Sequence, residues 1–126
     1  MSQGPLIASI SAYGGVKIID NADFNNTLMT TRGGWKSSLN ITAATAIKAS
    51  AGRIAKIIIV AQGTSGSFTF NDVTTTGGAA ASNQILTFAF NAYAVGTVLD
   101  VDWPCLSGIT LSAVPAGSPI IVVSYT

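Results

Sequence analysis

Residues 51–72 read AGRIAKIIIVAQGTSGSFTFND, and this stretch decides the fold class. A Gly/Ser-rich loop after an apolar run is typical either of an enzyme's phosphate-binding loop or of a turn between two strands. A P-loop requires G-x-x-x-x-G-K-[ST] followed by a helix, whereas residues 63–66 lack the following Lys and lead into an alternating Phe-Thr-Phe segment. We therefore interpret the stretch as two β-strands joined by a hairpin loop.

The rest of the chain repeats this pattern of short β-branched and aromatic runs separated by turn formers, which predicts an all-β sandwich or barrel. Phe68 and Phe70 share one strand face, with Asn71 on the other. A helix is a poor alternative, because its only plausible site, 42–51, is short, β-branched and followed by Gly52. Strands are predicted at 46–49, 53–61, 67–71, 84–90, 97–102, 109–113 and 120–125, with an eighth within the first forty residues.

Residues 1–44 differ in amino-acid composition from the rest of the chain. They contain several Gly and Asn pairs, with short apolar pieces at 6–10 and 16–19 between them. This predicts an N-terminal arm with short strands before a β-sandwich body at 45–126. The arm is expected to pair either with its own body or with a neighbouring subunit.

Composition excludes several classes of protein. Charged residues make up 9% of the chain against 48% apolar, and the net charge is +1, which argues against a nucleic-acid partner. The single cysteine, Cys105, excludes an internal disulfide and fits a reducing cytoplasm. The start has no convincing signal peptide, and the longest apolar stretch, 54–61, is shorter than the ~20 residues of a membrane-spanning helix.

The sequence contains few of the residue types on which catalysis usually depends. Without His or Glu, the chain lacks the usual general base and carboxylate acid, so we expect no enzyme, catalytic residue or cofactor. Asp100 and Asp102 share a predicted strand face, and a cation site there would draw on Asp72 as a further ligand. We favour solvated charges that protect a strand edge and expect no metal. Cys105 is expected to be a small buried thiol.

Two strands are apolar on both faces, which predicts that their outer faces are covered. The cover is either the chain's own arm or other copies of the protein. The residues predicted to form a subunit interface are Ile54, Ile58, Val60, Ile120 and Val122. In the strand at 97–102, Leu99, Val101 and the following Trp103 are predicted to point inward, with Trp103 in the core.

The order AIKASAGRIAKIIIVAQGTSGSFTFND, GTVLDVDWPCLSGITLSAVP and PIIVVSYT resembles small tailed-bacteriophage virion proteins of the decoration, cement or fibre-base type. The resemblance covers about residues 45–126. It implies a compact jelly roll, often a homotrimer, on the outside of a capsid or at the base of a head or tail appendage. Residues 1–44 carry no such resemblance.

The resulting hypothesis is a non-enzymatic capsid decoration protein on the virion exterior, made in the host cytoplasm. Its expected partners are other copies of itself and the major capsid protein or another virion protein, without nucleic acid or membrane. Lys17, Arg32 and Trp35 of the arm are expected to contact the capsid. The alternatives are a tail or head-fibre component, and a carbohydrate-binding module that uses Trp35, Tyr13 or Tyr93 as a stacking platform.

Overall fold

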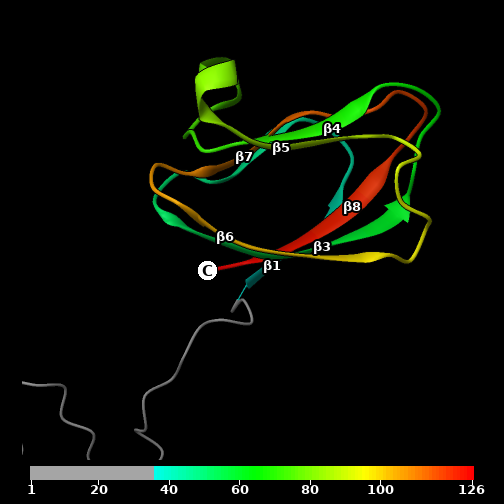
Figure 1. The fold of residues 1–126 in the computed structure, drawn as a ribbon, viewed down its shortest axis with the longest axis horizontal. Helices are drawn as coiled ribbons and strands as arrows, with labels where there is room; N and C mark the ends of the chain where they lie inside the picture. Colours follow the sequence, from blue (N-terminus) through cyan, green and yellow to red (C-terminus); the bar gives the residue numbers. More distant parts are fainter. Residues whose placement is uncertain (1–35) are drawn as a thin grey trace, which may run out of the picture. The chain divides into compact units, whose positions relative to one another are not determined.

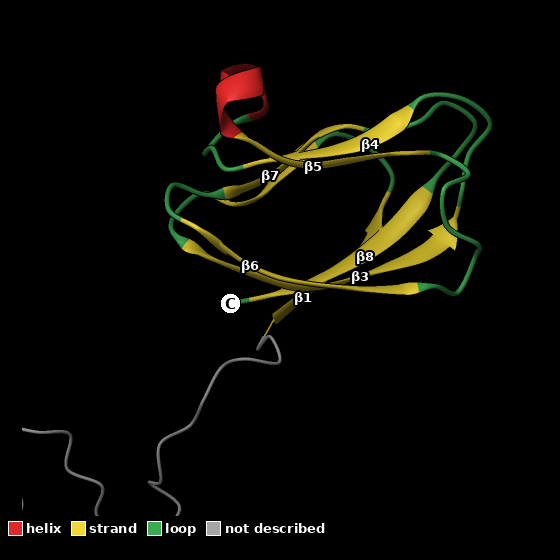
Figure 2. Cartoon of the chain, viewed as in Figure 1, coloured by secondary structure: helices red, strands yellow, loops and turns green. Residues whose placement is uncertain are grey.

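The computed structural model describes residues 36–126, and within this range the chain is an all-β structure of two four-stranded sheets (Figures 1 and 2). The predicted arm residues before position 36, including Lys17, Arg32 and Trp35, lie outside the described residues. The strands are β1 (Lys36–Ile41), β2 (Thr45–Lys48), β3 (Gly52–Ala61), β4 (Ser67–Asn71), β5 (Gln84–Ala89), β6 (Val98–Cys105), β7 (Ile109–Ala113) and β8 (Ile120–Tyr125).

All strand pairs are antiparallel, and the sheets have the orders β1-β8-β3-β6 and β2-β7-β4-β5. We name them the β3 sheet and the β4 sheet, each after one of its interior strands. The two sheets form separate layers (Figure 2). Their facing sides enclose an apolar core in which Ile57, Ile59 and Val123 of one sheet meet Phe68 and Phe70 of the other. Burying each such side chain contributes about 1.5 to 3 kcal/mol, which fixes the register of the strands.

The strand predictions are confirmed at all seven positions, and β1, which begins within the first forty residues and ends at Ile41, supplies the eighth strand by pairing with β8. The largest difference is at β6, which continues through Trp103 and Pro104 to Cys105. Proline is tolerated there because β6 is an edge strand and needs no donor on its open side.

The connection at 62–66 is a turn between two strands, as predicted, but the hairpin prediction is wrong. β3 and β4 belong to different sheets, so the chain crosses from one layer to the other at this point. Gly63 and Gly66 adopt positive φ, and the N–H of Thr64 donates to the carbonyl of Ala116 at 2.7 Å. A hairpin within one sheet and a crossover between two sheets share the same local pattern of strand, loop and strand. The sequence pattern therefore does not distinguish them.

The loop between β4 and β5 contains two 3-10 turns, η2 (Thr76–Gly78) and η3 (Ala81–Asn83), and Asn71 holds it in place. Asn71 is buried at the end of β4. Its amide nitrogen donates to the carbonyl of Ala80 at 3.0 Å and to Oδ1 of Asn83 at 2.6 Å, and Ser112 Oγ donates to Asn71 Oδ1 at 2.6 Å. The satisfied amide fastens the loop to the β4 sheet.

Candidate binding surfaces

The outer face of the β3 sheet carries an apolar stripe that crosses three strands. Ile58 of β3 lies directly opposite Val98 of β6 on one side and Val122 of β8 on the other, and directly paired residues share a face. Val60 and Ile120 extend the stripe along β3 and β8, because their neighbours Ile59 and Ile121 are buried on the inner face. We name Ile58, Val60, Val98, Ile120 and Val122 the outer stripe.

Four of the five predicted interface residues therefore lie together, and Ile54 does not. Ile54 is 0% exposed and packs in the core, so the prediction that it faces outward with Ile58 is wrong. Ile54 and Lys56 of β3 pair with Tyr125 and Ser124, which are adjacent in β8, so Ala55 is an extra residue and forms a β-bulge against β8. A bulge reverses the alternation of faces, and two consecutive residues, Ile54 and Ala55, are buried as a result.

Two ion pairs flank the stripe. Lys56 Nζ lies 3.5 Å from Asp100 Oδ1, and Arg53 Nε lies 2.7 Å from Asp102 Oδ1. Each aspartate thus has its own cationic partner, and within residues 36–126 no three His, Cys, Asp or Glu side chains come together in a way that could hold a metal ion. Exposed pairs of this kind contribute about 0 to 1 kcal/mol, so they serve mainly as a polar border of the stripe.

Asp72 has a different role from a cation ligand. Its carboxylate accepts hydrogen bonds from the N–H groups of Leu106 at 2.9 Å, Ser107 at 2.7 Å and Gly108 at 3.1 Å. Burial of the carboxyl acts to raise its pKa, but these three hydrogen bonds outweigh burial, and the pKa of Asp72 lies below its ordinary value. Asp72 therefore fixes the loop between β6 and β7.

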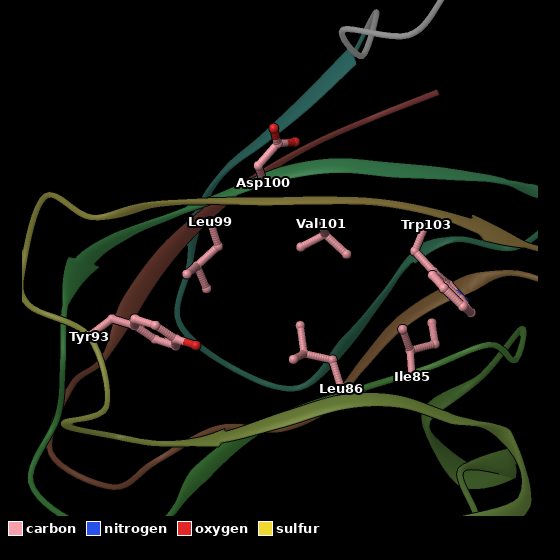
Figure 3. A pocket seen from close by; sticks show the side chains of 7 residues that line it. All are labelled: Ile85, Leu86, Tyr93, Leu99, Asp100, Val101 and Trp103. Atoms are coloured by element: carbon pink, nitrogen blue, oxygen red, sulfur yellow. The ribbon is translucent and has the colours of Figure 1, made fainter.

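A second candidate surface is a cleft between β5 and β6, the edge strands of the two sheets (Figure 3). Side chains of β6 point toward those of β5 across this cleft, and Asp100 points away from it (Figure 3). The cavity volume is about 280 Å³. The lining residues are Ile85, Leu86, Tyr93, Leu99, Asp100, Val101 and Trp103.

Trp103 corrects a further prediction. It lies opposite Ile54 and so faces inward in phase with Leu99 and Val101, as predicted, but it is 53% exposed and is not a core residue. Because β6 is an edge strand, its inward side chains border the cleft, where the indole lies beside Ile85 (Figure 3). Leu99 and Val101 are half-buried and pack against the core, which confirms their inward direction.

Tyr93 closes the other end of the cleft. Its ring makes an edge-to-face contact with Phe88, with centroids 5.4 Å apart, and its carbonyl accepts a hydrogen bond from Gln62 Nε2 at 2.6 Å. The contribution of Ile85 to the cleft was missed from the sequence. A shift in register between β4 and β5 at Ile85 turns two consecutive residues of β5 toward the cleft, and strict alternation gives no sign of it.

Cys105 is buried, as expected for a small packed thiol. Burial, together with the negative charge of Asp72, raises the pKa of the thiol to about 11. A thiol with this pKa is almost entirely protonated at neutral pH and is a poor nucleophile.

The chain matches no protein-family model, and neither the curated proteins nor the solved structures contain a significant match to it. Within residues 36–126, no helix is long and apolar enough to cross a membrane.

Proposed function

We propose that this chain is a non-enzymatic structural protein of a bacteriophage particle, with a capsid decoration role and a jelly-roll body. The strand order supports the jelly roll. Within residues 36–126, eight strands form two four-stranded sheets, β1 pairs with β8, and the chain passes repeatedly from one sheet to the other. Jelly rolls are a common architecture of viral capsid proteins, and this agrees with the family resemblance of residues 45–126.

The outer stripe is the observation that carries the proposal. A sheet face exposed to water normally alternates with polar residues, yet here Ile58, Val98 and Val122 form an unbroken apolar row across three adjacent strands. Val60 is 43% exposed and Val98 is 52% exposed within the described part of the chain. Such a row, bordered by the Lys56–Asp100 ion pair, has the apolar centre and polar rim of a protein interface.

Neighbouring subunits of a homotrimer cover the outer stripe in this proposal, and the arm around Lys17, Arg32 and Trp35 contacts the major capsid protein. The mechanism is thermodynamic linkage. A protein that binds the assembled lattice and not its dissociated subunits stabilises the lattice in proportion to the logarithm of its free concentration. This mechanism consists of non-covalent binding and has no catalytic step.

The oligomer is tested with the variant Ile58→Asp/Val60→Asp, which places two charges in the stripe. The matched control is Thr74→Asp/Thr76→Asp, which adds the same charges on the exposed loop between β4 and β5. Light scattering after size exclusion is expected to show a trimer for the wild type and the control, and smaller species for the stripe variant. An unchanged assembly of the stripe variant contradicts the stripe as an interface.

The decoration role is tested separately by adding the purified chain to undecorated phage heads. Saturation at a copy number comparable with that of the major capsid protein, together with increased resistance of the heads to heat, supports decoration. Saturation at a few copies per head indicates the fibre or tail alternative instead. An absence of binding overturns both roles.

A carbohydrate-binding module is the second candidate, and one observation favours it. Tyr93 and Trp103 are both partly exposed at the two ends of the cleft, where aromatic rings can stack on sugars. The remaining lining is aliphatic except for Asp100, whose carboxylate faces Lys56, so the cleft offers few groups for sugar hydroxyls. Quenching of Trp fluorescence by glycans, lost in Trp103→Ala, would support this candidate.

A further inference from the structure

β1 is held in the sandwich by its backbone more than by its side chains. Within the described range, β8 is the strand that pairs with β1, because β1 lies at the edge of the β3 sheet. Of the six residues of β1, Ile41 is buried, and the exposed ones are Lys36, Ser37, Leu39 and Asn40. Burying one isoleucine contributes about 1.5 to 3 kcal/mol, so side-chain packing holds β1 less firmly than it holds β3, which buries four residues.

The connection from β1 to β2 is short and follows an unusual backbone conformation. Residues 42–44 are all exposed, and they join edge strands of two different sheets. Asn40 has φ of 53°, in the left-handed region that residues other than glycine rarely adopt, and the register with β8 is irregular between Ser38 and Ile41. Short and strained hinges of this kind favour exchange of the adjoining element between copies of a chain, because exchange relieves the tight closure.

The outward side of β1 continues the outer stripe. Ser38 lies directly opposite Val123 of β8, which is buried in the core, so Ser37 faces outward. Leu39, two residues after Ser37, is 67% exposed on the same side. β1 thus carries a large apolar side chain at the edge of the face that holds the stripe. An assembly built on the outer stripe therefore brings a neighbouring copy close to β1.

We propose that β1 is exchanged between copies in the assembled protein, so that β1 of each copy pairs with β8 of the next. The exchange rests on the homotrimer proposed for this protein. It keeps the register of the β1–β8 ladder and the burial of Ile41, because the neighbour's β8 is identical to the chain's own. The backbone from Ile41 to Thr45 spans at most about 14 Å, so the receiving copy lies directly against this side of the sandwich.

An exchanged strand links two copies more firmly than a surface contact does. Residues 1–35 precede β1, so each exchanged strand also carries this segment to the neighbouring copy. Separation of two copies then requires β1 to leave its ladder with β8, in addition to loss of the contacts at the outer stripe. The assembly is therefore expected to dissociate more slowly than one held by surface contacts alone.

A pair of cysteines across the β1–β8 ladder distinguishes exchange from pairing within one chain. Ser37 and Ser124 lie directly opposite each other, and residues so paired are close enough for a disulfide. The full-length Ser37→Cys/Ser124→Cys protein is oxidised under native conditions and analysed by intact mass and non-reducing electrophoresis. Exchange is expected to shift the product from the mass of one chain to that of two or three linked chains. A single chain with an internal disulfide overturns the exchange.

Thr69→Cys/Thr87→Cys is the matched control. These residues are also directly opposite each other, on β4 and β5, and their hydroxyl oxygens lie 3.0 Å apart. Both strands stay within one copy, so this variant is expected to form an internal disulfide. Cys105 is buried and common to both variants, so it does not produce a difference between them. Linked chains in equal yield from both variants indicate random collision between copies, and this outcome also overturns the exchange.

Light scattering of the reduced Ser37→Cys/Ser124→Cys protein separates the exchange from the oligomer on which it rests. A trimer that gives linked chains after oxidation supports both. A trimer that gives only internal disulfides overturns the exchange and leaves the subunit contact at the outer stripe in place. A monomer at every concentration overturns the subunit contact and the exchange together.

Lengthening the connection between β1 and β2 tests its role as the hinge. An insertion of Gly-Ser-Gly-Ser after Ala43 removes the tight closure, so the Ser37→Cys/Ser124→Cys protein is then expected to form mostly internal disulfides. The same insertion after Gly77, in the exposed loop between β4 and β5, is the control and is expected to leave the linked chains. If the insertion after Ala43 does not lower the yield of linked chains, the short connection is not the hinge of an exchange.

Discussion

Ile54 and Trp103 lie directly opposite each other in the β3–β6 ladder and face the same side of the sheet, yet Ile54 is 0% exposed and Trp103 is 53% exposed. The difference arises from the position of their strands. β3 lies inside its sheet and is covered by the β4 sheet, whereas β6 is an edge strand that borders the cleft. Ile54 therefore belongs to the core and Trp103 to the surface, although the two residues are paired on one face of the sheet.

This difference predicts unequal effects of truncation on stability. Ile54→Ala is expected to lower the free energy of unfolding by about 2 to 5 kcal/mol, because it leaves a cavity among fully packed neighbours. Trp103→Ala removes a larger side chain but is expected to cost only about 1 kcal/mol, since half of it already contacts water. Chemical denaturation of both variants checks the order, and an equal or larger loss for Trp103→Ala contradicts it.

Asp72 is expected to stabilise the fold in a pH-dependent way. Its pKa is lowered in the folded state, so its contribution is fully present above the pKa of the unfolded chain, near 3.8, and is lost as the pH falls through the lower folded value. Asp72→Ala leaves the N–H groups of Leu106, Ser107 and Gly108 without this acceptor, and it is expected to cost about 1 to 3 kcal/mol at neutral pH.

The measurement is urea denaturation of the wild type and Asp72→Ala at neutral pH and at acid pH. The stability difference between them is expected to shrink below pH 3.8, where the wild-type carboxyl becomes protonated in the unfolded and then in the folded state. A difference that stays constant across this range would show that the charge of Asp72 does not contribute.

Cys105 is expected to react slowly with thiol reagents in the native protein. Burial and the charge of Asp72 raise its pKa to about 11, so little thiolate forms at pH 8. Denaturant should accelerate the reaction strongly. Since the folded pKa is the higher one, the contribution of the neutral thiol to stability is present below the unfolded pKa of 9.0 and is lost as the pH rises toward 11. Labelling kinetics with and without denaturant test this expectation, and equal rates would contradict it.

Gly108 is expected to be required for close packing of the chain. A Cβ at this position would lie 2.6 Å from the carbonyl oxygen of Val73 and 2.8 Å from that of Lys48, and both are backbone atoms that cannot rotate away. Gly108→Ala should therefore destabilise the fold by about 1 to 3 kcal/mol. Gly77→Ala is the matched control, because a Cβ there meets nothing within 4 Å. Thermal unfolding of the two variants distinguishes them, and similar melting temperatures would refute the packing argument.

Most strands were predictable because alternation of apolar and polar residues is a local property. The runs that became β4 and β8 were placed at their observed bounds, and the apolar outer side of β3 correctly placed Ile58 and Val60 on one face. Ile54 was misplaced because the bulge at Ala55 depends on pairing with β8, which lies far along the chain. No local pattern contains that information.

The cleft was the least predictable feature of the candidate sites. Its lining comes from β5, β6 and the loop that carries Tyr93, and its existence requires β5 and β6 to be the adjoining edges of two different sheets. The sequence predicted that Leu99 and Val101 point inward. It contained no sign that Ile85 and Leu86 would both turn toward them from the opposite sheet, or that Trp103 would be left half exposed.

The sequence by itself determined the all-β class, the strand positions and the doubly apolar character of β3 and β8, because side chains alternate every two residues along any strand. Only the tertiary structure decided which strands pair, which lie at an edge and which side chains a bulge redirects. Those outcomes depend on contacts between residues distant in sequence, and they separate the buried Ile54 from the exposed Trp103 opposite it.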